Sequence, residues 1–101
     1  MNVQIQSVHF KADQKLLTLI ERKIQKLHQF YRNITAAEVT LRLEKTGQVS
    51  DKIVDIHLNI PGSRLHCRET EKSFEAAADA AANCMRRLIK KHKQKASAKA
   101  A

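Results

Sequence analysis

The chain has 101 residues and carries 19 lysines and arginines against 10 acidic residues, a formal net charge of +9. This length supports one hydrophobic core and is too short for two, so we expect a single domain. A hydrophobic content of 43%, with only two glycines and one proline, excludes a disordered or fibrous chain. No apolar run is long enough to cross a bilayer and the first residues do not form a signal peptide, so we expect a cytosolic protein.

The first two predicted elements are a strand and an amphipathic helix. Apolar residues alternate over residues 2–9, which predicts a strand, and their phase slips by one near Ser7. Either a bulge or the end of regular pairing explains such a slip. Asp13 is a suitable N-cap for a helix whose apolar residues then recur every three or four positions up to Arg32.

Three further strands follow the helix. The apolar period changes to two from residue 37, breaks at residues 46–50 and resumes through residue 60. Pro61-Gly62 then leads into a strand that contains Leu65 and Cys67. Because this dipeptide suits a type II turn better than the primed turns of two-residue hairpins, we expect a slightly longer loop here.

The last predicted element is a helix that opens between Thr70 and Ser73 and carries an alanine-rich apolar stripe. Residues 95–101 have no apolar face to bury, so we expect a flexible basic tail after a domain of residues 1–94. The order βαβββα predicts an α+β fold, because a strand-helix-strand start forms a parallel crossover and later strands pair as antiparallel hairpins. We expect a four-stranded mixed sheet with two helices packed on one face and the other face exposed to water.

The excess positive charge is concentrated on the two predicted helices. Residues 11–32 carry six basic and two acidic side chains, and residues 80–101 carry seven basic residues and no acid. The helix dipole accounts for about two or three C-terminal cations, but not for seven. We therefore predict a nucleic-acid surface on the helices, with an anionic membrane, an acidic protein surface or a solubility feature as alternatives. Aromatic residues are absent from the predicted open sheet face, which disfavours base stacking there.

The cysteines and histidines give no sign of a metal or disulfide framework. Cys67 and Cys84 are separated by 16 residues and form no CxxC pair, so we expect two reduced, buried thiols. The five histidines lack the usual spacing of metal ligands. His66 and Cys67 would point to opposite faces of a strand. The sequence therefore predicts no metal site.

No set of residues forms a recognisable catalytic site. Asp51 and Asp55 can share one face of a strand, but a solvated edge or an RNA-repelling position explains them better than an acid/base pair. A nucleophile elbow and a phosphate-binding glycine loop are both missing. An enzyme that uses His66 or Cys67 has almost no support, so we expect no enzyme activity, no cofactor and no small-molecule substrate.

Several short segments occur in an order that is typical of one protein family. They are the Val3-Gln4-Ile5 strand, the Leu27-His28-Gln29-Phe30-Tyr31 helix end, the Lys72-Ser73-Phe74-Glu75-Ala76-Ala77-Ala78-Asp79 helix start and the Arg86-Arg87-Leu88-Ile89-Lys90-Lys91-His92-Lys93 helix end. Together with the βαβββα order, they resemble the bacterial ribosome hibernation-promoting factors, also called ribosome-associated translation inhibitors. The likeness covers nearly the whole chain, and the ordered combination carries it rather than any single segment.

The resemblance implies a small non-enzymatic protein that binds 16S rRNA on the small ribosomal subunit and overlaps the paths of mRNA and of tRNA in the A and P sites. Such a protein silences idle ribosomes in the cytoplasm during stress or stationary phase, is monomeric off the ribosome and needs no membrane. Some family members carry a second, dimerising domain after a linker. The 101 residues of this chain contain no such domain, so we expect it to resemble the short form of the family. The residues assigned to rRNA binding are Lys15, Arg22, Lys23 and Lys26 in the first helix and Arg86, Arg87, Lys90, Lys91 and Lys93 in the second.

The alternative binding function is that of a double-stranded or structured RNA-binding domain unrelated to the decoding site. Domains of the αβββα kind place basic residues at the start of the last helix, where the helix dipole favours phosphate. In this sequence that end carries Glu71, Glu75 and Asp79, which disfavours the alternative.

Overall fold

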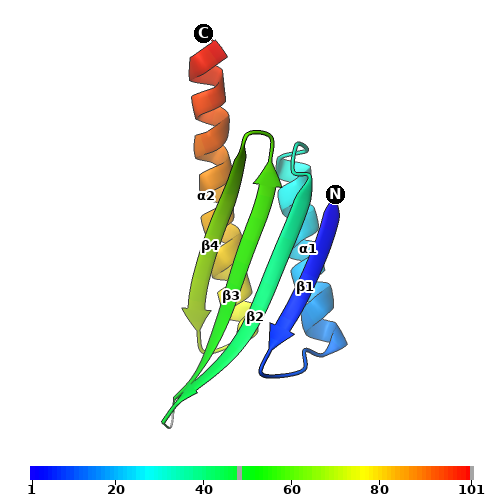
Figure 1. Cartoon of the computed structure of the whole chain (residues 1–101), viewed down its shortest axis with the longest axis vertical. Coiled ribbons are helices and arrows are strands. Elements are labelled where there is room, and N and C mark those ends of the chain that lie inside the picture. Colours follow the sequence, from blue (N-terminus) through cyan, green and yellow to red (C-terminus); the bar gives the residue numbers. More distant parts are fainter. Residues whose placement is uncertain (48, 101) are drawn as a thin grey trace.

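The predicted order βαβββα is confirmed by the computed structural model, which describes residues 1–47 and 49–100 (Figure 1). The elements are β1 (Asn2–Val8), α1 (Gln14–Phe30), β2 (Ala36–Thr46), β3 (Val49–Ile60), β4 (Ser63–Glu71) and α2 (Phe74–Ala100). Both helices lie on the same face of the sheet, behind it in the view of Figure 1. The expected α+β fold, with two helices on one face, is therefore confirmed.

The sheet is mixed, with the strand order β1-β2-β3-β4. β1 pairs with β2 in parallel, and the other neighbouring strands are antiparallel. Pairing of β1 runs without a break from Asn2 opposite Ala36 to Val8 opposite Arg42. His9 then leaves the strand with a positive φ of 69°. The phase slip in the sequence therefore marks the end of pairing and not a bulge.

α1 begins with the Asp13 cap that its sequence predicts and ends at Phe30, two residues before the predicted Arg32. The Asp13 carboxylate accepts a hydrogen bond from the Leu16 backbone N–H at 2.9 Å, which satisfies one of the free donors of the first turn. At the other end, the Tyr31 backbone N–H donates to the Leu27 carbonyl at 2.9 Å. The intervening apolar stripe is buried, which holds the opposite side of α1 toward solvent.

The hydrophobic core lies between the sheet and the two helices. Its largest fully buried side chains come from both helices and the two central strands: Ile20, Ile24 and Leu27 in α1, Val39 and Leu41 in β2, Val54, Ile56 and Leu58 in β3, and Met85 and Ile89 in α2. Buried Ala77, Ala78 and Ala81 keep α2 thin on its inner side, so its backbone packs close to the sheet.

The connection between β3 and β4 is shorter than expected. Ile60 pairs directly with Ser63, so only Pro61 and Gly62 join the strands, and the prediction of a longer loop is wrong. Gly62 has a φ of 78°, the left-handed conformation that a type II turn requires at its third residue. Because glycine adopts this conformation without a steric penalty, two residues are enough to reverse the chain.

Cys67 and Cys84 form a disulfide between β4 and α2, so the expectation of two reduced thiols is wrong. Cys67 is buried on the helix-facing side of β4, and α2 packs along that strand. The Cα atoms of Cys67 and Cys84 lie 6.2 Å apart, within the range that a disulfide spans. The pairing follows from the way α2 lies on β4, which the spacing of the cysteines in the sequence does not show.

Candidate nucleic-acid interface

α1 and α2 pack against each other, and a shallow hollow between them is lined with basic side chains. Lys23 and Lys26 come from α1, and Arg86 comes from α2. The spacing of Asp79 and Arg86 along α2 is close to two helical turns, so both side chains face this hollow. The contact between the helices therefore gathers cations that are far apart in the sequence.

One of these cations is paired with an acid inside the hollow. Lys23 Nζ donates a hydrogen bond to an Asp79 carboxylate oxygen at 2.9 Å, which links the two helices. This hydrogen bond and the positive charge of Lys23 lower the pKa of Asp79. Among the side chains that the structure describes, Lys26 and Arg86 take part in no ion pair. These two cations are therefore available to an external anion.

Phe30, at the end of α1, makes cation–π contacts with two basic residues of α2. The Arg86 guanidinium carbon lies 5.6 Å from the ring centroid, and Lys93 Nζ lies 4.7 Å from it. Lys93 Nζ also donates to the Phe30 carbonyl oxygen at 3.4 Å. Lys90 lines the same hollow as Phe30 and Lys93. Because cation–π attraction favours a cation over the ring face, Phe30 orients basic side chains of α2 beside α1.

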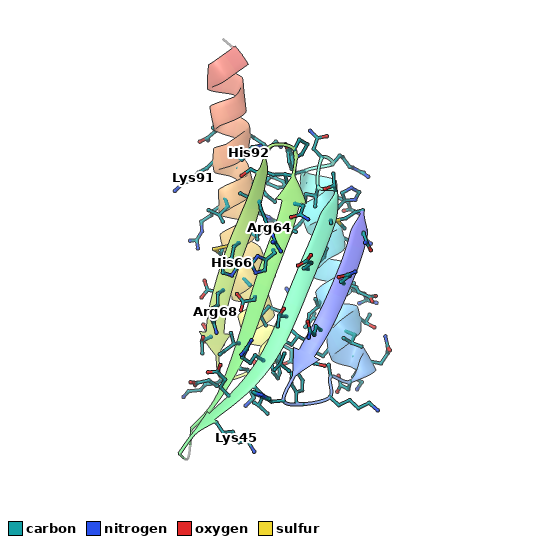
Figure 2. The ribbon with its side chains drawn as sticks, in the orientation of Figure 1. Lys45, Arg64, His66, Arg68, Lys91 and His92 are labelled. Carbon is teal, nitrogen blue, oxygen red and sulfur yellow. A yellow bond between two sulfur atoms is a disulfide. The ribbon has the colours of Figure 1, made fainter. Side chains whose placement is uncertain are left out.

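The predicted rRNA-binding residues therefore occupy more than one part of the surface. Lys23, Lys26, Arg86, Lys90 and Lys93 lie together on what we call the interhelical basic surface. Lys15 and Arg22 line another hollow on α1 with Leu19. Arg22 also lines a hollow with Lys23 and Lys26, so it borders the interhelical basic surface. Lys91 points away from α1, on the outer side of α2 (Figure 2), and Arg87 lies one turn earlier on that flank. The role of all nine residues in RNA binding stays a prediction.

The sequence could not reveal two features of this surface, the Lys23–Asp79 pair and the position of Phe30 beneath two cations. Helical spacing alone predicts the row of cations along α2, because it depends only on positions within one helix. A contact between α1 and α2 depends instead on how each helix is rotated on the sheet. The only local signal was an aromatic residue at the end of a basic helix.

Basic residues on the open face of the sheet are largely compensated by acids. The ion pairs there are Arg64–Glu38 at 2.9 Å, Arg68–Asp55 at 3.6 Å and Arg42–Glu44 at 3.9 Å. Burial, followed by the effects of His66 and Arg64, lowers the pKa of His57, so its imidazole is neutral at pH 7. This face therefore attracts polyanions less strongly than the interhelical basic surface does.

Neither helix, over the residues that the structure describes, has both the length and the apolar character needed to cross a membrane.

Curated relatives of this chain are ribosome hibernation promoting factors. One from Pseudomonas putida is 30% identical over 95 residues, which cover 94% of this chain and 89% of that protein. Another from Escherichia coli K12 is 27% identical over 95 residues, covering 94% of this chain and 96% of that protein.

Solved structures show the same fold. A ribosomal subunit interface protein from Coxiella burnetii superposes with a TM-score of 0.84 at 19% identity, covering 93% of this chain and 99% of that one. The N-terminal domain of Thermus thermophilus Protein Y superposes with a TM-score of 0.78 at 20% identity, covering 91% and 99%. A family model described as "Sigma 54 modulation protein / S30EA ribosomal protein" matches residues 3–97. The resemblance found in the sequence is thereby confirmed, and the chain belongs to this family, together with the ribosome hibernation promoting factors.

Proposed function

We propose that the protein is a ribosome hibernation factor that binds 16S rRNA of the small ribosomal subunit and blocks the paths of mRNA and of tRNA in the A and P sites. Family membership and the names of the relatives support the ribosomal role. The observation that carries the binding mode is the interhelical basic surface, where both helices present cations on one side of the molecule. The open sheet face, with its paired charges, offers no comparable surface among the described residues.

Binding through this surface depends on phosphate neutralisation. Each phosphate contact by lysine or arginine releases condensed counterions, so the logarithm of the binding constant falls linearly with the logarithm of salt concentration. Such contacts position the protein without reading base sequence, which suits a folded rRNA surface. The sheet and core behind the helices then exclude mRNA and tRNA by occupying their space. No cofactor and no catalytic step is required, and the site of action is the cytoplasm, where the protein arrives as a monomer.

The remaining predicted residues extend the contact around the molecule. Lys15 and Arg22 lie in a hollow on α1. Lys91 lies on the outer flank of α2, and helical spacing places Arg87 on the same flank. A protein seated in a groove of rRNA meets phosphates on more than one side. We therefore propose that these four cations contact phosphates on the sides of the rRNA groove. The interhelical basic surface contacts phosphates at the bottom of the groove.

Charge reversal tests the proposal directly. Arg86 and Lys90 are exposed, so an Arg86→Glu/Lys90→Glu variant should keep the melting temperature of the wild type. We expect this variant to lose co-sedimentation with isolated small subunits, because two phosphate contacts become repulsive. Lys45→Glu, compared with Lys90→Glu alone, is the control matched in charge, since Lys45 lies near the hairpin between β2 and β3, far from Lys91 (Figure 2). Unimpaired co-sedimentation of the double variant, or equal loss with the control, would remove the interhelical basic surface from the site.

A comparison of binding to a plain RNA duplex and to the small subunit tests the alternative function. A general binder of structured RNA would bind a plain RNA duplex and the small subunit with similar affinity. The acidic start of α2, with Glu75 in its first turn, opposes phosphate at the helix N-terminus. We therefore expect much weaker binding to the duplex than to the small subunit.

A further inference from the structure

Three side chains with metal-binding atoms gather on the open face of the sheet, opposite the helices. His57 of β3 and His66 of β4 are direct partners in the antiparallel register. Asp55 precedes His57 by two residues and therefore shares its face. One donor atom from each of the three residues lies within 4.8 Å of the other two. His66 stands between Arg64 and Arg68 in the row of β4 side chains in Figure 2.

The strand pairing brings these groups together before any ligand arrives. The two imidazole rings are stacked, with centroids 4.2 Å apart and an angle of 7° between their planes. The Nε2 atom of His66 lies 2.5 Å from an Asp55 carboxylate oxygen. The Asp55 side chain is only 15% exposed, whereas His66 is open to solvent. A fixed carboxylate beside two imidazoles, one of them accessible, is a donor set that an incoming cation can reach.

We propose that Asp55, His57 and His66 form a binding site for a divalent transition-metal cation of the Zn²⁺ type. Two imidazole nitrogens and one carboxylate oxygen suit zinc, whereas calcium and magnesium prefer oxygen ligands alone. In tetrahedral zinc sites with metal–ligand distances of about 2.0–2.1 Å, neighbouring donor atoms lie roughly 3.4 Å apart. The donor atoms lie within 4.8 Å of one another, so the side chains must rotate toward a common centre to reach this spacing. Water takes the fourth position, on the solvent side.

Arg68, which lies beside the site, opposes the cation and provides a specific signature. Arg68 Nε lies 3.6 Å from the second carboxylate oxygen of Asp55, and the Arg68 side chain is 52% exposed. Arg68 therefore has room to turn into solvent when the metal binds Asp55. Removal of its charge leaves the carboxylate free, so Arg68→Gln should bind the metal several-fold more tightly than the wild type. A histidine that bound metal by chance elsewhere on the surface would not respond to this substitution.

The test is a calorimetric titration of the oxidised full chain with zinc chloride, in which the Cys67–Cys84 disulfide keeps both thiols from competing. We expect one bound Zn²⁺ per chain, with affinity about tenfold or more lower in His57→Ala and in His66→Ala. The matched control is His9→Asn, because asparagine tolerates the positive φ of that residue and the substitution removes an exposed histidine outside the triad. In wild-type NMR spectra, Zn²⁺ should shift the ring signals of His57 and His66 and leave those of His28 in place.

Equal affinity in the wild type and both alanine variants, or ring shifts confined to other histidines, would overturn the proposal. Absence of binding to the wild type would also overturn it. Unchanged affinity in Arg68→Gln would remove Asp55 from the ligand set. Should an alanine variant fail to fold, the wild-type ring shifts decide the question alone. The proposed metal site lies on the opposite side of the sheet from the interhelical basic surface. The result of the zinc titration is therefore independent of whether the protein binds the ribosome.

Discussion

Lys23 of α1 and Asp79 of α2 are joined by a hydrogen-bonded ion pair of 2.9 Å in the floor of the interhelical basic surface. The pair connects the two helices that carry the excess charge of the protein. It also neutralises one of the cations on the surface that we propose contacts rRNA. The pair therefore favours the packing of the two helices and weakens the attraction of the surface for rRNA.

Substitution of Asp79→Asn should tighten binding to the small subunit by about two- to fivefold, the range expected for an exposed ion pair. The substitution releases the Lys23 ammonium group and removes a negative charge from the floor of the surface. Fluorescence anisotropy at fixed salt concentration measures the change. Glu44→Gln is the matched control, because it removes the same charge from the open face. Weaker binding of Asp79→Asn would show that the pair positions Lys23 for RNA.

The same pair makes a pH-dependent contribution to stability. The pKa of Asp79 is lower in the folded chain than in the unfolded chain, because Lys23 donates a hydrogen bond to the ionised carboxylate. The contribution is therefore complete above about pH 4 and is lost as the pH falls through the folded value. Carbon-detected NMR titration of the Asp79 carboxyl group should show the low pKa. In Lys23→Gln it should return toward the ordinary value, and an unchanged pKa would contradict this cause.

Replacement of Phe30→Leu should weaken small-subunit binding by about two- to fivefold, the effect of losing a cation–π contact of about 0.5–1 kcal/mol. Leucine keeps most of the apolar volume but no longer orients Arg86 and Lys93. Phe10→Leu is the matched control, since the Phe10 ring stacks on Phe74 at 4.5 Å and contacts neither of these cations. Equal binding by Phe30→Leu and the wild type would mean that the ring does not organise the site.

Reduction of the Cys67–Cys84 disulfide should lower the free energy of unfolding by about 3 kcal/mol, the chain-entropy value for a short closed loop. The two cysteines are 17 positions apart in the sequence, so the loop is short. Urea unfolding with and without dithiothreitol measures the difference. Cys84→Ser should unfold identically in both conditions. A reductant effect of the same size in Cys84→Ser would exclude the disulfide as its origin.

The sequence predicted the features of this fold that depend on neighbouring residues. The period-two strands, the Asp13 cap of α1 and the basic row along α2 all follow from local spacing. The element order and several short segments also identified the family. These patterns are sufficient because strand and helix geometry repeats within a few residues.

The sequence did not predict contacts that join distant positions. The disulfide, the cations over Phe30 and the Asp55, His57 and His66 triad each require two elements to meet in a particular register or rotation. The predicted length of the β3–β4 loop was wrong for a different reason. Two-residue hairpins usually have primed turns, but here Pro61 and Gly62 join the strands on their own. Spacing within one element carries no information about such tertiary contacts.

Hydroxyl-radical footprinting of 16S rRNA in isolated small subunits, with and without the protein, tests the central claim most directly. We predict protection of backbone positions along the mRNA path and in the A and P sites, and loss of this protection with the Arg86→Glu/Lys90→Glu variant. Protection confined to other regions of the subunit, or an unchanged footprint with the variant, would contradict the account.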